Sequence, residues 1–455
     1  MQPALLALAL GLGSAIADDG VEAEPPTSET TTASANGTAD GAADGTAEGE
    51  PAKENPWDRT GWGWGGVPAV AYNSDDGLGG GLLVSLYRYN GHTAPYKWSG
   101  TLLLYVTTKG VHTHRLDLDM LEVGGLPLRI NTRVEFGASK SSNYCGEGPD
   151  YVCDTAEAQA AAEALGLTEG GDPITLEGEE TDYASFVSRY YKIRNIYPNA
   201  FINARYMLSD KPHRLELMAS WWGQYYIPGD FQVRAPYPES RYDQDHADGE
   251  PGFNSNLQFG VMLDNRDNEP SPIRGYWSEA SIRGASRFWG SDWQYFGFNV
   301  TLRGYTPLGT ERVVLADRLV LDGIVGDQPI SAMSRAGGSQ IYSFFGGQRA
   351  GRGVRNSGVL GRVRAMNQTE VRATVWTHRF LDKVTFDLTP IAYYDVGYWA
   401  WDWSDIGGGN EGIVWGTGGG VRLGFNKNFI IRADVGVSPR ESWKVQTYID
   451  ISNLW

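Results

Sequence analysis

Long apolar runs are nearly absent from this sequence of 455 residues. The one clear run covers residues 5–12, whereas a membrane-spanning helix needs about 20 apolar residues. No transmembrane helix is therefore predicted, and if the chain enters a membrane we expect it to cross as strands. The run is followed by Ala15, Ile16 and Ala17, a small-x-small cleavage site. Residues 1–17 are therefore predicted to be a secretory signal peptide, although no Lys or Arg precedes the run.

Basic residues are in the minority. The chain has 38 Lys and Arg against 55 Asp and Glu, a formal net charge of -17. Nucleic-acid binding uses a basic footprint, so this balance argues against it. Residues 18–55 hold ten acids and one base, Lys53, which accounts for -9 of the -17 and leaves -8 for the rest. The segment is otherwise mostly Ala, Gly, Thr, Ser and Pro, and we expect it to be disordered.

Cysteine is also scarce, with only Cys145 and Cys153 in the chain. Both lie in a polar insert predicted at residues 140–182, which also contains a helix-like stretch at 156–165. In an exported chain, a disulfide that closes a small loop is expected rather than a reactive or metal-binding pair.

Motifs for catalysis, cofactors and metals are missing. No Gly-x-Ser-x-Gly elbow occurs, and the glycines at 77–81 match no phosphate-binding fingerprint. His112 and His114 share one strand face without a third ligand. Residues 264–268 faintly resemble a calcium loop, but Arg266 and the lack of a terminal Glu favour a turn. We therefore expect no enzyme activity, no cofactor and no metal, with a hidden loop-borne catalytic site as the weakest alternative.

The sequence is rich in alternating segments, glycines and aromatic residues, with 59 Gly and 12% aromatics. In 428–437, for example, Val435 lies opposite Arg432 and Asp434, and in the last segment Ile449 lies opposite Gln446. Residues 56–455 therefore predict an all-β fold, a transmembrane antiparallel β-barrel of about sixteen strands. A soluble sandwich also alternates, but long strands, aromatic residues near strand ends and the export signal favour the membrane. The strands are predicted at 78–90, 96–108, 111–120, 127–139, 183–194, 197–209, 212–226, 253–265, 274–287, 291–307, 311–326, 367–380, 384–398, 411–425, 428–437 and 442–453, with an extra short strand at 67–72.

The connections are of two kinds. Tight turns at 109–110, 381–382 and 426–427 are predicted to be periplasmic, and longer loops at 227–252, 327–366 and 399–410 to be extracellular. Counting strands back from the C-terminus places the insert 140–182 on the periplasmic side. A strand missed within 212–252 would reverse that side.

Four short motifs follow one another in a fixed order along residues 67–455. They are a glycine-rich first strand region, a turn, an arginine–glycine loop segment and a pair of strand motifs with a carboxylate: 68–81 (PAVAYNSDDGLGGG); 264–276 (DNRDNEPSPIRGY), with Asp264, Arg266, Asp267, Pro272 and Gly275; Gly346 and Gly347 with 352–355 (RGVR); and 370–372 (EVR) with 395–397 (DVG). Together they resemble the surface-antigen superfamily of outer-membrane barrels, the BamA/TamA-like assembly and translocation proteins. The last strand contains Tyr448 and the chain ends on Trp455, an aromatic C-terminal signal common in such barrels.

The resemblance implies that the long loop folds into the barrel. Glu370 and Asp395 lie on the polar faces of neighbouring predicted strands, so Arg352 is expected to pair with one or both of them, with Gly353 and Gly397 completing the two motifs. Arg349 or Arg355 in that role, or a mobile surface loop, are the alternatives. Val354 replaces the family's aromatic residue after Arg-Gly. The POTRA domains of the family are not recognisable before the barrel, which points to its barrel-only branch.

The leading functional hypothesis is an outer-membrane pore, translocation or assembly-type protein with a hydrated, charged lumen. Inward-facing charges are expected at several strand positions: Arg303, Arg372, Arg422, Arg432, Glu279, Asp395 and Asp434. The expected partners are outer-membrane lipid, the barrel-assembly machinery during insertion, and an unidentified exported substrate. The rival hypothesis is a structural or surface-exposed barrel with a plugged lumen and no transport.

Overall fold

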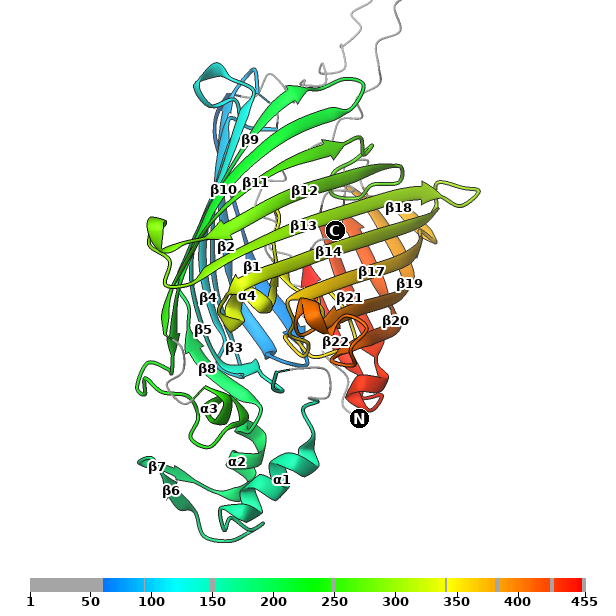
Figure 1. The fold of residues 1–455 in the computed structure, drawn as a ribbon. Helices are drawn as coiled ribbons and strands as arrows, with labels where there is room; N and C mark the ends of the chain where they lie inside the picture. The colour runs from blue at the N-terminus through cyan, green and yellow to red at the C-terminus, as the bar shows by residue number, and fades with distance from the viewer. Residues whose placement is uncertain are drawn as a thin grey trace, which may run out of the picture.

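The alternating segments form a single wall of antiparallel strands that closes on itself (Figure 1). The computed structural model describes residues 60–93, 95–147, 152–246, 251–339, 342–380, 384–425 and 429–451. The predicted signal peptide 1–17, the acidic segment 18–55 and Trp455 lie outside the described residues. Among the helices that are described, none is long and apolar enough to cross a membrane.

The wall has sixteen strands. Eighteen segments share one sheet, but β8 (Lys192–Ile196) runs on as β9 (Asn199–Ser209), and β17 (Val363–Ala373) runs on as β18 (Trp376–Phe380), since each pair borders the same neighbour. The other strands are β1 (Thr60–Asn73), β2 (Gly77–Asn90), β3 (Trp98–Thr107), β4 (His112–Met120), β5 (Leu128–Asn143), β10 (Arg214–Pro228), β11 (Gly252–Asp264), β12 (Gly275–Ala285), β13 (Gln294–Pro307), β14 (Val313–Asp327), β19 (Val384–Ala400), β20 (Glu411–Phe425), β21 (Phe429–Val437) and β22 (Gln446–Ile451). Each strand pairs with the next, and β22 pairs with β1 to close the barrel.

The predicted all-β barrel of about sixteen strands is confirmed, but two of its segments were wrong. Residues predicted as a strand at 183–194 form the helix α2 (Tyr183–Arg189) before β8 begins. Asp182 caps this helix by accepting a hydrogen bond from the Ser185 N–H at 2.7 Å. The extra short strand predicted at 67–72 is part of β1, a full strand of fourteen residues. The two errors cancel, so the total remains sixteen.

The two ends of the barrel differ in the length of their connections. The long ones, residues 144–191, 229–251, 328–362 and 401–410, all join strands at one end, which we call the loop end. Short connections such as 210–213 and 308–312 lie at the other end, the turn end. In such barrels long loops are extracellular and short turns periplasmic. Figure 1 shows the insert and α3 (Arg241–Asp245) beyond the same end of the wall.

The periplasmic position predicted for Lys109-Gly110 and for the insert 140–182 is wrong. Because successive antiparallel strands alternate in direction, the false strand at 183–194 reversed every connection before it. Lys109-Gly110 is a tight turn, yet it lies at the loop end, since it joins β3 to β4. The insert also starts later than predicted, because β5 continues to Asn143 and β8 begins only at Lys192.

The insert folds as a small unit beyond the loop end of the barrel (Figure 1). It contains α1 (Thr155–Ala164), a hairpin of β6 (Ile174–Leu176) and β7 (Glu179–Thr181), and α2. Its core packs small and aromatic side chains of the two helices together: Ala158, Ala162, Leu167, Phe186, Tyr190 and Tyr191. Short helical turns occur elsewhere in the connections: η2 (Val123–Gly125), η3 (Arg287–Trp289), η4 (Trp403–Asp405) and η5 (Pro439–Glu441).

Side chains alternate between an outer apolar face and an inner polar face, as predicted. On the outside Val435 is 49% exposed and Ile449 38%, while Gln446 is buried on the inside. His112 and His114 share the outer face of β4 with Leu116 and Leu118. A large exposed apolar surface on every strand suits contact with lipid rather than water.

Candidate functional site

A connection between β14 and β17 folds back into the lumen. This segment, residues 328–362, is called the plug loop below. It contains α4 (Ile330–Met333) and a small hairpin of β15 (Arg335–Ala336) and β16 (Tyr342–Ser343). Its apolar residues form a buried core with inward-facing side chains of the wall: Phe344, Phe345, Ala350, Val354 and Val359 pack with Val320, Met366, Trp399 and Val414. The plug loop is thus a packed part of the barrel interior.

Arg352 is the main polar anchor of the plug loop. Its side chain is 0% exposed. One guanidinium nitrogen lies 2.5 Å from a Glu370 carboxylate oxygen, and two further guanidinium nitrogens each lie 3.0 Å from Asp395. The Arg352 backbone N–H also donates to Asp395, at 2.9 Å. The guanidinium lies over the Tyr393 ring, 3.5 Å from its centre, so it is enclosed by an aromatic face and two carboxylates.

Around Arg352 lies a charge cluster in which arginines and carboxylates alternate. It comprises Arg352, Arg372, Arg422 and Arg432 with Glu370, Asp395, Asp434 and Asp450. Glu370 receives three arginines and Asp434 joins Arg422, at 2.5 Å, to Arg432, at 3.4 Å. The cluster is formally neutral, so each buried charge is compensated by its neighbours.

The sequence predicts a hydrated lumen around the inward-facing charges, but in the structure these charges are not exposed to water. The seven inward-facing residues predicted there are buried, with exposures from 0% to 6%: Arg303, Arg372, Arg422, Arg432, Glu279, Asp395 and Asp434. The plug loop occupies this part of the lumen and replaces water as the partner of the wall. The charged inner face of the wall is therefore covered by the plug loop.

Glycines in the wall let the plug-loop backbone approach closely. A Cβ atom placed at Gly416 would lie 2.0 Å from the Arg352 carbonyl oxygen, and one at Gly436 would lie 3.0 Å from the Gly353 nitrogen. Gly353 itself has φ of +94°, a conformation that other residues rarely adopt. Gly397 leaves room for a ring, because a Cβ there would lie 2.5 Å from Phe345. Val354 lies in the apolar core of the plug loop.

A second anchor holds an earlier part of the plug loop through its backbone. The N–H groups of Gly337 and Ser339 donate to Asp322 at 2.9 Å and to Glu279 at 2.8 Å. Asp322 also receives both terminal nitrogens of Arg283, each at 2.9 Å, and forms an ion pair with Arg364. Two sites therefore fix the loop to the wall, and both include residues of β17, Arg364 at the second anchor and Glu370 at the first.

The aspartate–arginine turn lies at the turn end, between β11 and β12. Arg266 donates to both carboxylate oxygens of Asp264, at 2.9 and 2.7 Å. Asp267 accepts the Ile273 N–H at 3.0 Å. Gly275 has φ of +99°, and a Cβ there would lie 2.4 Å from the Asn265 carbonyl oxygen. Pro272 lies within the same connection. These contacts are all local and make the segment a rigid turn.

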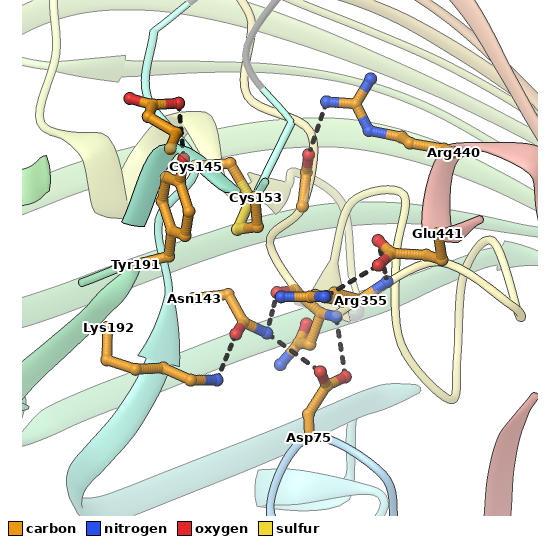
Figure 2. The surroundings of a disulfide bond; sticks show 12 residues. Asp75, Asn143, Cys145, Cys153, Tyr191, Lys192, Arg355, Arg440 and Glu441 are labelled. Atoms are coloured by element: carbon orange, nitrogen blue, oxygen red, sulfur yellow. Dashed lines mark hydrogen bonds and ion pairs between the residues drawn. A yellow bond between two sulfur atoms is a disulfide. The ribbon is translucent and has the colours of Figure 1, made fainter. Parts of the chain in front are cut away.

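A disulfide joins Cys145 to Cys153 at the start of the insert, as Figure 2 shows. Near it, the Tyr191 hydroxyl donates to Glu157 at 2.6 Å. The pKa of Tyr191 is raised well above its usual range, mainly by burial and in the second place by this hydrogen bond. The phenol therefore stays protonated and donates. Within the described residues, no group of three or more His, Cys, Asp and Glu side chains is placed to hold a metal ion.

Several residues of the interior were not singled out from the sequence. They are Tyr393 and Gln368 beside Arg352, Asp322, Arg283 and Arg364 at the second anchor, and Asn143, Asn356 and Glu441 near the loop end. Most are polar residues on the inner face of an alternating strand. That pattern predicts that they face the lumen, but not that they contact the plug loop.

Comparison with known proteins gives a family and a fold. The Omp85 superfamily domain matches residues 178–451. A crystal structure of BamA from Haemophilus ducreyi lacking POTRA domains 1-3 is similar with a TM-score of 0.51 and 12% identity, over 87% of this chain and 70% of that one. CdiB from Escherichia coli is similar with a TM-score of 0.55 and 10% identity, over 86% of this chain and 62% of that one. No curated protein sequence matches.

The two structural similarities concern the fold, because both identities are low. The chain spans less than two thirds of the length of CdiB. No POTRA-like domain precedes the barrel within the described residues, which begin at Thr60, the first residue of β1. The domain match covers more than half of the 455 residues and includes the arginine–glycine loop, its two carboxylate strands and the turn. The chain therefore belongs to the Omp85 superfamily of outer-membrane β-barrels.

Proposed function

We propose that this barrel is a translocation conduit for an exported substrate and that the plug loop is its gate. The observation that carries the proposal is the way the loop is held. Arg352 is fully enclosed by wall carboxylates, yet it belongs to a connection and not to the wall. The same inner face that holds the loop would line a charged channel if the loop left it.

The chemistry of the anchor suits a switch between two states. A buried ion pair gains little over well-packed apolar groups, but removing one partner costs about 3–5 kcal/mol because a charge is left uncompensated. Partial release of the loop is therefore unfavourable, whereas complete release lets water solvate all eight charges at once. A substrate that supplies charged groups to the wall would lower the cost of release.

Conductance in planar lipid bilayers tests the conduit. The intact conduit should open briefly, and a variant lacking residues 340–360 should show steady single-channel currents. The rival hypothesis, a structural barrel with a plugged lumen, predicts an intact protein that never opens. A barrel that conducts only after the deletion would therefore favour the rival. Heat-modifiable migration of the deletion variant on gels would show that it still folds as a barrel.

A second candidate function, assembly of other barrels, is favoured by the junction of the first and last strands. Only two residue pairs join β1 to β22 among the described residues, Tyr72 with Ile449 and Asn73 with Tyr448, whereas all fourteen residues of β1 pair with β2. A short junction leaves strand edges that can accept another strand. A client barrel assembled at this junction would be inserted into outer-membrane lipid. The barrel-assembly machinery would insert this chain itself.

The two functions make different demands on this junction. If the chain assembles other barrels, a disulfide formed between Tyr72→Cys and Ile449→Cys should abolish the insertion of client barrels into lipid vesicles, and reduction should restore it. A conduit that works through the lumen needs no free strand edge, so the variant lacking residues 340–360 should keep its currents in the presence of the same disulfide. We assign no catalytic role to the barrel.

A further inference from the structure

The plug loop also touches both sides of the junction between β1 and β22, which we call the seam. On the β22 side, the Gly353 N–H donates to the Tyr448 hydroxyl at 3.1 Å. Arg355 pairs with Glu441, in the connection that leads into β22, at 2.7 Å. On the β1 side, the Asn356 N–H donates to Asp75 at 2.8 Å. Three neighbouring loop positions therefore bridge a junction in which, among the described residues, two residue pairs join β1 to β22.

Asp75 is the central residue of this bridge, and Figure 2 shows its contacts. It lies in the tight turn between β1 and β2, and it is only 6% exposed. Its two carboxylate oxygens accept from different segments, one from the Asn356 N–H and the other from the Asn143 side-chain amide at 3.0 Å. A buried carboxylate with two N–H donors from distant segments ties those segments to its own strand.

Asn143 extends the contact to the base of the insert. Its amide group also donates to the Asn356 carbonyl oxygen at 3.0 Å, and its side-chain oxygen accepts from Lys192 at 2.5 Å. Asn143 ends β5 and Lys192 begins β8, so both belong to the continuous wall. The turn that carries Asp75 is thus held against a fixed part of the barrel through the plug loop.

We infer that residues 353–356 are a latch that holds the seam shut while the plug loop is inside the lumen. The latch consists of Gly353, Arg355 and Asn356 with their partners Tyr448, Glu441 and Asp75. Within the part of the chain that the structure describes, two residue pairs join β1 to β22, so these three contacts add substantially to what holds the two strands together at the loop end. Release of the loop weakens the seam, and opening of the seam weakens the hold on the loop.

This coupling is reciprocal, because both events break the same contacts. It goes beyond the gating of the lumen and the assembly of clients, and it holds whether or not either activity is found. The lumen and the seam then open and close together, as one two-state element. A ligand that displaces the plug loop would loosen the seam without touching β1 or β22.

Hydrogen–deuterium exchange on the protein in lipid nanodiscs tests the latch through Asp75→Asn. An amide offers one acceptor where the carboxylate offers two, so one of its two donors must lose its partner. Exchange should rise about tenfold both in residues 66–73 of β1 and in residues 352–358 of the loop, since the loss of a hydrogen bond to a charged group shifts local opening by at least that factor.

The matched control is Asp76→Asn, one residue further along the same turn. Among the described residues, the Asp76 carboxylate accepts a hydrogen bond from Asn73 within its own turn, at 2.8 Å, so its variant should leave the exchange of both regions unchanged. If Asp75→Asn does not fold, Tyr448→Phe removes the acceptor of the Gly353 N–H and should raise exchange in the same two regions. Faster exchange in the loop alone, in the seam alone or in neither would overturn the inference.

Discussion

At the scale of single residues, the interior is governed by the requirement that buried charges have partners. Arg352 meets that requirement with two carboxylates from neighbouring strands, and its planar guanidinium reaches both at once. The sequence pointed to Arg352, Glu370 and Asp395, through the arginine–glycine motif and the parity of the two strands, and these residues lie together. Asp75 could not be assigned in this way. It binds a backbone N–H that is 281 positions away in the sequence. Because every residue except proline has a backbone N–H, the residue type does not reveal this donor.

Replacement of Arg352 by lysine should destabilise the barrel. Arg352 reaches Glu370 and Asp395 from three different nitrogens, whereas a lysine donates from one nitrogen only, so at least one buried carboxylate loses contacts. We expect the free energy of unfolding to fall by about 2 kcal/mol or more, and by about 3–5 kcal/mol for Arg352→Ala. Urea unfolding in lipid vesicles, followed by tryptophan fluorescence, measures the change.

Arg312→Lys is the control, since Arg312 is exposed in the connection between β13 and β14. It should unfold at the same urea concentration as the unmodified protein. Equal stability of the Arg352→Lys and Arg312→Lys variants would mean that the enclosed ion pairs contribute nothing to the fold.

At the scale of elements, alternation predicted most strands to within a few residues, because one face meets lipid and the other meets a polar interior. It failed for residues 183–189, where Tyr183, Phe186 and Val187 were taken as strand residues. Their spacing, with Asp182 as a capping residue, is that of a helix. The start of β1 was missed because glycines alternate there with Trp62 and Trp64, and glycine carries no polarity signal.

The register of β3 can be tested with two adjacent positions. Leu102 is 42% exposed on the outer face, whereas Thr101 points inward and is paired with Asp117 of β4. Arginine at position 102 should cost about 2–4 kcal/mol of unfolding free energy, as expected for a charge near the middle of the bilayer. Arginine at position 101 should cost clearly less than arginine at position 102, because it would lie on the polar inner face of the strand. Equal costs would place the strand in the wrong register by one residue.

The disulfide should act on the insert and not on the barrel. Replacing both cysteines by serine frees a loop of roughly nine residues, which should reduce the local stability of the insert by about 2–3 kcal/mol. Limited proteolysis should then cleave residues 144–191 faster, while the heat-modifiable migration of the barrel stays the same. Loss of that migration would show that the disulfide supports the wall. In the unmodified protein, thiol labelling under denaturing, non-reducing conditions should detect no free cysteine.

At the scale of the whole molecule, the direction of each strand decides which connections meet the cell exterior. With β1 as a full strand and 183–189 as a helix, Lys109-Gly110 and the insert belong to the loop end, together with the connection 401–410. Tags at residues 110 and 405 should therefore both be labelled on intact cells. A tag at residue 210, between β9 and β10, should be labelled only after the outer membrane is opened. Labelling of residue 210 on intact cells would invert the assignment.

The central claim is that a plug loop anchored to the wall closes a conduit through the lumen. Single-channel recordings of the Arg352→Ala and Arg312→Ala variants in planar bilayers test it most directly. Loss of the Arg352 anchor should produce frequent openings of well-defined conductance, whereas the Arg312 variant should remain as quiet as the unmodified protein. A folded Arg352→Ala barrel that stays silent, together with a silent folded barrel that lacks residues 340–360, would contradict the account.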